Sequence, residues 1–170
     1  MLASLNIMIN YSQLILYLPS IQKPGHLWTD PEFNQGFAWS PGIVSFGVPE
    51  DAFVCDVEID VKGAFTLSPD AISCIQVPFD INESPLQVGS VFFYDPVDVP
   101  KAKYSLFYEV LPGARRIWEM EVDGTQQSGN VDYILKLWFV PDESNHYEII
   151  KMGGAVRSDK VLERVSPINV

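Results

Sequence analysis

The stretch "FVCDVEIDV", residues 53–61, carries the clearest structural signal in the sequence. Apolar side chains occupy alternate positions, and carboxylates occupy three of the positions between them. Because successive side chains of a β-strand point to opposite faces, this alternation predicts a strand with one face in the core and the other toward solvent. The predicted core face holds Phe53, Cys55, Val57, Ile59 and Val61, and the predicted solvent face holds Asp56, Glu58 and Asp60.

Short apolar runs of the same period recur on both sides, separated by turn signals such as "SPG", "LPGA" and "VDGT". No long stretch has the 3.6-residue period of a helix. About seven to nine short strands with this spacing are typical of an antiparallel β-sandwich, so the sequence predicts an all-β fold. The further strands are expected near residues 9–17, 43–47, 72–78, 86–94, 103–110, 115–122 and 131–140.

Length and composition predict one domain. A chain of 170 residues with 47% hydrophobic content can bury one full core but is short for two, so a single domain over residues 1–170 is expected. The polar segment "DGTQQSGN", residues 123–130, is expected to be a mobile hairpin tip. Near the C-terminus the pattern weakens, which predicts a final strand and a loosely held tail from about residue 155.

The stretch "HLWTDPEFNQG", residues 26–36, departs from the β pattern. Thr29 and Glu32 have the spacing of a capping box, in which each side chain accepts a hydrogen bond from a backbone N–H at the start of a helix. Gly36 suits the left-handed residue that ends a helix, and a proline in the first turn costs little. The stretch therefore predicts a short α-helix at residues 30–35.

Two interpretations of this helix remain open. Trp28 and Phe33 have the spacing of a hydrophobic staple, so a structural role is complete without any partner. The alternative is that the helix contacts a partner protein, and Asp30 is the residue that such a contact would use. We favour the structural role because cap, staple and stop signal are all present.

The charge balance restricts the possible partners. A formal net charge of -11 repels nucleic-acid phosphates, so no direct nucleic-acid binding is expected and a basic protein is the natural complement. Two cysteines outside any metal-binding spacing are expected to be core residues in a reducing, cytoplasmic compartment. The apolar N-terminus lacks a basic region and is interrupted by polar residues, so it predicts a strand rather than a signal or a membrane span.

The sequence gives little support for catalysis. His26 and His146 are the only histidines, and neither has the neighbours of a metal site. No nucleophile elbow or phosphate-binding loop is present. We therefore expect no enzyme activity, no bound metal and no cofactor.

Several segments together resemble a known family. In order they are "INYSQLILYLP", "WTD", "QGFAW", "GIVSF", "VPFDI", "VDVPKAKYSLFYEV" and "DYILKLWFVP". They are similar to the ComJ-like inhibitors of a competence-associated DNA-entry nuclease over roughly residues 9–141, most specifically at Trp28-Thr29-Asp30 with Gly36 and the strand from Gly42 to Phe46. The resemblance implies an acidic, β-rich protein that binds and silences a metal-dependent, nonspecific nuclease. Residues 111–130 and the chain beyond residue 141 have no counterpart, which leaves room for a different nuclease, such as the toxin of an immunity pair.

Carboxylates are the candidates for contact with a basic partner. Those on the outer face of the strand at residues 53–61 would lie ~7 Å apart, close to the spacing of successive phosphates, and so could mimic a nucleic-acid strand. The alternative, which we favour, is that they only keep the strand soluble. Glu119 and Glu121 form a weaker pair, partly offset by Arg115 and Arg116. The candidate contact residues are Asp56, Glu58, Asp60, Glu50, Asp51 and Asp30.

Two further function classes fit the same fold. A carbohydrate-binding sandwich would present exposed rings such as Trp39, Trp118 or Trp138 for stacking on sugars. A non-catalytic assembly subunit needs no specific site. Binding driven by carboxylates should weaken steeply with salt, whereas sugar stacking should not, so ionic strength separates a nuclease inhibitor from a sugar-binding module.

Overall fold

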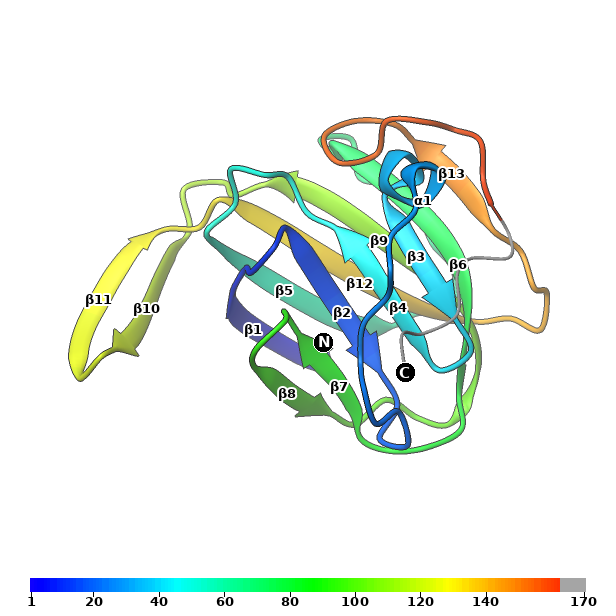
Figure 1. The fold of residues 1–170 in the computed structure, drawn as a ribbon, viewed down its shortest axis with the longest axis horizontal. Helices are drawn as coiled ribbons and strands as arrows, with labels where there is room; N and C mark the ends of the chain where they lie inside the picture. The colour runs from blue at the N-terminus through cyan, green and yellow to red at the C-terminus, as the bar shows by residue number, and fades with distance from the viewer. Residues whose placement is uncertain (163–170) are drawn as a thin grey trace.

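The computed structural model describes residues 1–162, which form thirteen strands and one short helix (Figure 1). In chain order the elements are β1 (Ala3–Met8), β2 (Gln13–Tyr17), α1 (Asp30–Gln35), β3 (Phe37–Ser40), β4 (Ile43–Gly47), β5 (Val54–Val61), β6 (Ser73–Ile81), β7 (Leu86–Gly89), β8 (Tyr94–Val97), β9 (Ala102–Pro112), β10 (Ile117–Val122), β11 (Thr125–Asn130), β12 (Tyr133–Pro141) and β13 (Glu148–Lys151). The all-β prediction is confirmed. No helix in this part of the chain is long and apolar enough to cross a membrane.

A six-stranded sheet has the strand order β1-β5-β12-β9-β6-β13. All neighbours in it are antiparallel except β5 and β12, which run parallel. This pair is an exception within the predicted antiparallel sandwich. A parallel pair needs a long crossover, and here more than seventy residues separate the two strands in sequence, a relation that local periodicity does not record.

A five-stranded sheet, β3-β4-β2-β7-β8, forms the second layer, and the main hydrophobic core lies between the sheets. Within this core, Tyr108 of β9 is fully buried and stacks on Phe46 of β4, with ring centroids 4.3 Å apart. Its hydroxyl donates a hydrogen bond of 3.0 Å to the carbonyl oxygen of Gly47. One residue thus joins the two layers by apolar contact and by a satisfied polar group.

Strand β5 confirms only part of the pattern at residues 53–61. Cys55, Val57 and Ile59 are buried in the core as predicted. Phe53 precedes the strand and its side chain is largely exposed, so its assignment to the core is wrong. Most of the opposite face is not the solvent face that the alternation predicted, because Asp56 and Glu58 on it are buried.

The helix prediction is confirmed in detail. Helix α1 spans Asp30–Gln35, with Thr29 as its N-cap, both hydrogen bonds of the capping box present, and Gly36 left-handed at φ 83°. The backbone N–H of Thr29 and its hydroxyl both donate to Glu32 Oε1 at 2.9 Å. The helix leads directly into β3, and the local sequence therefore determines this element almost completely.

The segment from residue 18 to residue 29 crosses the outer face of the smaller sheet (Figure 1). His26 holds it there, with Nδ1 3.0 Å from Ser45 Oγ and Nε2 3.1 Å from Ser40 Oγ. Burial lowers the pKa of His26 to about 4, although the nearby Glu32 acts in the opposite direction. His26 is therefore a neutral structural residue that positions the segment entering α1.

The structure adds detail to two predicted segments. The polar stretch at residues 123–130 supplies the turn of a hairpin, at Asp123 and Gly124, and also its second strand, β11. This hairpin projects from the sandwich beyond the start of β5 (Figure 1). Near the C-terminus, Ala155 and Val156 are buried, although the tail was expected to be loosely held from about residue 155. The remainder of that predicted tail, from residue 163 onward, lies outside the described residues.

Candidate functional site

The predicted acidic face of β5 is mostly enclosed. Asp56 and Glu58 are only 8% and 5% exposed, so the expectation that they face solvent is wrong. Arg116, at the base of the projecting hairpin, places Nη1 2.6 Å from Glu58 Oε2 and 3.3 Å from Asp56 Oδ2. The side-chain amide of Asn6 also donates to Asp56. The hydrogen bond to Glu58 is the main cause that raises the pKa of Arg116.

Asp60, the third acid of the same face, is partly exposed. Its Oδ1 accepts a hydrogen bond from the backbone N–H of Val61 at 2.9 Å and lies 3.7 Å from the N-terminal ammonium group. The three carboxylates thus do not form an open row for a partner. Partner contact by these acids stays a prediction, but their first role in the fold is to bind the cations and donors beside them.

Charged groups continue across the outer face of the larger sheet. Lys136 of β12 lies in register between Glu58 of β5 and Glu109 of β9. Glu109 is fully buried, and its carboxylate accepts hydrogen bonds from the Ser68 backbone at 2.8 Å and from Trp138 Nε1 at 2.8 Å. The buried carboxylates on this face are therefore satisfied by hydrogen bonds and ion pairs. The alternation within one strand could not show this, because the partners come from other strands and loops.

The other predicted contact residues lie near α1 and the turn that precedes β5. Glu50 is exposed, with Oε1 3.8 Å from Arg157 Nη2. Asp51 accepts a hydrogen bond of 2.7 Å from the hydroxyl of Tyr133. Asp30 is exposed in the first turn of the helix. Glu50 and Asp30 are thus accessible in a way that Asp56 and Glu58 are not.

A surface groove of about 430 Å³ lies between α1, the start of β2 and the end of β4. We call it the α1 groove. Its lining residues are Tyr11, Ser12, Gln13, Trp28, Phe33, Gly47, Val48, Glu50, Ala155 and Arg157. The groove gathers residues from five separate parts of the chain, including the Trp28 and Glu50 singled out from the sequence.

Aromatic side chains dominate the accessible part of the α1 groove. Tyr11 is 74% exposed and Phe33 is 49% exposed, while Trp28 is half-buried and donates from Nε1 to Gln13 Oε1 at 3.2 Å. The guanidinium of Arg157 lies 4.4 Å from the centre of the Phe33 ring. Trp28 and Phe33 therefore both line a surface groove, and the staple contact between them stays a prediction.

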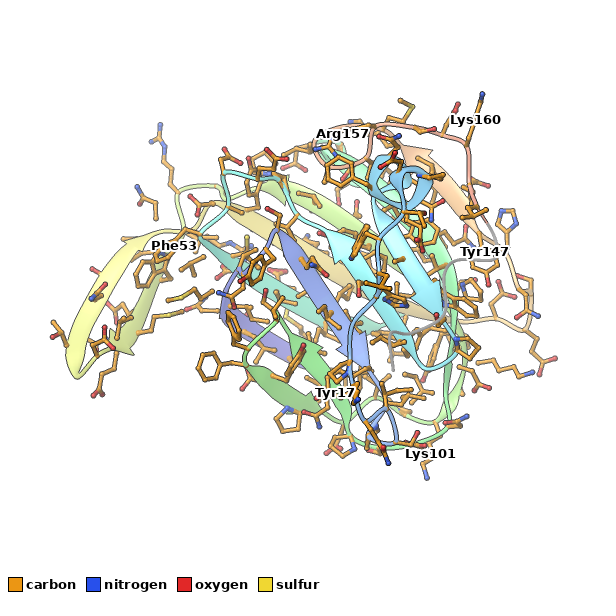
Figure 2. The ribbon with its side chains drawn as sticks, viewed as in Figure 1. Tyr17, Phe53, Lys101, Tyr147, Arg157 and Lys160 are labelled. Atoms are coloured by element: carbon orange, nitrogen blue, oxygen red, sulfur yellow. The ribbon has the colours of Figure 1, made fainter. Side chains whose placement is uncertain are left out.

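Tyr11 and Arg157 are among the groove residues that sequence reasoning missed. Tyr11 is presented by a tight turn in which both Tyr11 and Ser12 have positive φ, 54° and 53°. Arg157 reaches the groove because its backbone N–H donates to the carbonyl of Asn34 in α1 at 2.7 Å. Neither position can be read from the local sequence. Tyr11 lies in an unusual turn without glycine, and Arg157 depends on a contact across more than a hundred residues. Figure 2 shows Arg157 beside α1 and Phe53 at the base of the projecting hairpin.

The groups with chemical reactivity are placed as structural residues. Cys55 and Cys74 are buried, and burial raises the pKa of both thiols, to about 12 for Cys55. His146 lies on the surface with Nε2 2.9 Å from Glu148 Oε1. Within residues 1–162, no group of three or more His, Cys, Asp or Glu side chains is arranged to hold a metal ion.

Comparison with known proteins places this architecture. No curated protein sequence matches the chain. The solved structure described as ComJ, inhibitor of the DNA degrading activity of NucA, from Bacillus subtilis, has the same fold, with a TM-score of 0.61 and 20% sequence identity over 81% of this chain and 96% of that chain. The family model described as competence protein J (ComJ) matches residues 6–140, and the chain therefore belongs to the ComJ family.

Proposed function

We propose that the protein is a nuclease inhibitor that binds a metal-dependent, nonspecific nuclease and blocks its active-site cleft without catalysis of its own. The observation that carries the proposal is membership of the ComJ family, together with the shared fold of a ComJ that inhibits the DNA degrading activity of NucA. The net charge of -11 supports it, because a cleft that holds nucleic-acid phosphates must be basic. A basic nuclease is the partner that these properties fit.

The α1 groove is the surface that we assign to this contact. Partly exposed aromatic rings are the residues that most often dominate protein interfaces, and Trp28, Phe33 and Tyr11 provide three of them side by side in one groove. Glu50 and Asp30 add carboxylates near the rings, suited to steering a basic partner. The partner would thus be held by apolar contact at the groove and guided by charge around it.

The two other function classes have less support. Trp118 and Trp138 are buried, and Trp39 is half-buried with Nε1 donating to the carbonyl of Pro78 at 2.7 Å. These rings do not form the exposed platform that a carbohydrate-binding module needs. A non-catalytic assembly subunit has no observation that favours it. Inhibition of a toxin nuclease by an immunity protein remains within the proposal, since it uses the same kind of contact.

The cytoplasm is the compartment that we propose, supported by two buried cysteines that are not joined by a disulfide. The test is degradation of plasmid DNA by the nuclease encoded beside this protein, with and without a stoichiometric amount of the purified chain. We expect intact plasmid in the presence of the chain, and an affinity that weakens as salt rises. Unchanged degradation at equimolar and tenfold excess protein would refute the proposal.

A further inference from the structure

The hairpin formed by β10 and β11, which we call the arm, is firmly attached at its base. Trp118 of β10 is 5% exposed and packs against Val54 and Val131 in a small core of its own. Gly129 lies directly across from it, and a Cβ at that position would come within 3.0 Å of the indole ring. Arg116 adds its two ion pairs to the buried carboxylates of β5. The direction in which the arm projects is therefore determined by the body of the protein.

Beyond this base the arm is only two strands wide. Half of the residues of β10 and nearly all of β11 are exposed, and within residues 1–162 β11 pairs with β10 alone. A two-stranded hairpin is marginally stable by itself, and three strands are the usual minimum for independent stability. The arm thus gains more from an added strand than either main sheet would.

The hydrogen-bonding direction of each residue in β11 follows from the turn. Asp123 and Gly124 have φ values of 52° and 77° and form a two-residue turn, so Val122 and Thr125 make a hydrogen-bonded pair. The backbone N–H of Val131 donates a hydrogen bond of 2.7 Å to the carbonyl of Arg116. This hydrogen-bonded pair lies an even number of positions from the first, as the alternation of an antiparallel ladder requires. The residues between these pairs direct their backbone N–H and C=O groups away from β10. On β11 these residues are Gln126, Ser128 and Asn130.

This free edge lacks the features that usually prevent strand pairing. Edge strands are protected by charges, prolines or bulges. Strand β8 carries Asp95 and Pro96, and β13 has a register shift next to Lys151. Strand β11, "TQQSGN", has no charge, no proline and no bulge. It is therefore open to a partner that adds a strand by backbone hydrogen bonds.

The charge on the arm selects between the possible occupants. Residues 117–130 contain Glu119, Glu121 and Asp123 but no lysine or arginine, and within residues 1–162 none of these three acids has an ion-pair partner. Arg116 is engaged with the buried acids instead. A second copy of this chain would bring another net charge of -11, including the same three acids, next to the arm. A strand from a basic protein meets no such repulsion.

We propose that the outward edge of β11 pairs with an extended strand of the nuclease, so that the arm is a second contact in addition to the α1 groove. The inference rests on the proposed function, because the basic partner it requires is the inhibited nuclease. Glu119 and Glu121 lie on β10, one strand away from the added strand, and Asp123 lies in the turn at the tip. Long basic side chains of the nuclease that extend across β11 would meet these carboxylates.

Proline substitution tests the backbone contact directly. Ser128→Pro removes an outward N–H while leaving every hydrogen bond between β10 and β11 in place, and Ser128→Ala is the matched control that keeps the N–H. Binding is measured by biolayer interferometry with the nuclease encoded beside this protein, and plasmid degradation is followed in parallel. We expect the Kd to rise at least tenfold for Ser128→Pro and less than twofold for Ser128→Ala. Gln126→Pro should repeat the effect at a second outward position.

The outcomes separate the two proposals. If the parent chain neither binds nor inhibits the nuclease, the proposed function fails and this inference fails with it. If the parent binds and both proline variants bind equally well, only the inference is refuted. A loss of affinity together with altered tryptophan fluorescence of the free chain in both proline variants would also overturn it. So would self-association of the parent in sedimentation that Ser128→Pro abolishes. Glu119→Gln with Glu121→Gln should slow association at least threefold and reduce its salt dependence.

Discussion

Removal of Arg116 should destabilise the fold although the residue lies at the surface. Its guanidinium is the cation beside two carboxylates, Asp56 and Glu58, that are at most 8% exposed. Breaking a fully buried ion pair costs about 3–5 kcal/mol because the remaining charge has no partner. The side chain of Arg116 is 43% exposed, so solvent screening reduces this, and we expect Arg116→Ala to lower the free energy of unfolding by about 1–3 kcal/mol.

The assay is urea unfolding followed by tryptophan fluorescence, with the melting temperature as a second readout. In a chain of this size each kcal/mol should lower the melting temperature by about 2–4 °C. Arg115→Ala is the matched control, and its effect should stay within about 0.5 kcal/mol. Combining Arg116→Ala with Glu58→Gln should cost less than the sum of the single changes, because the double variant no longer leaves Glu58 charged and unpaired. Unfolding of Arg116→Ala at the parent's midpoint, or strict additivity in the double variant, would refute the reasoning.

Three further changes have defined outcomes. Thr29→Ala removes the capping hydroxyl of α1 and should lower the free energy of unfolding by about 0.5–2 kcal/mol in urea titrations, whereas an unchanged midpoint would argue against the cap. Because the pKa of His26 is lowered to about 4, between pH 6.5 and about 4 the unfolded chain binds a proton that the folded chain does not. The free energy of unfolding should therefore decline with falling pH in this window, and His26→Gln should flatten that decline. Equal slopes for the two proteins would contradict this reasoning. Trp28→Ala and Phe33→Ala should each raise the Kd for the nuclease at least tenfold in titration calorimetry, with Lys101→Ala, which lies far from the α1 groove in Figure 2, as the control that should not.

Local sequence patterns determined helix α1 and the strand content. The capping box of Thr29 and Glu32 and the stop at Gly36 act within one turn, so no distant contact was needed to place the helix at residues 30–35. The alternation at β5 likewise identified a strand and its core face, because side-chain direction in a strand is a property of the backbone. The resemblance to the ComJ family also rests on the linear order of motifs, which the sequence displays directly.

Tertiary structure alone decided which polar groups are accessible. The alternation could assign Asp56 and Glu58 to one face of β5, but only the packing of Arg116 against that face makes them buried and paired. The α1 groove depends on Tyr11 and Arg157 meeting Phe33 from opposite ends of the chain. The outward edge of β11 is free because, among the described residues, β11 pairs only with β10. Burial, ion pairing and edge exposure are relations between distant segments, whereas periodicity and capping are relations between neighbours, and a sequence displays only the second kind directly.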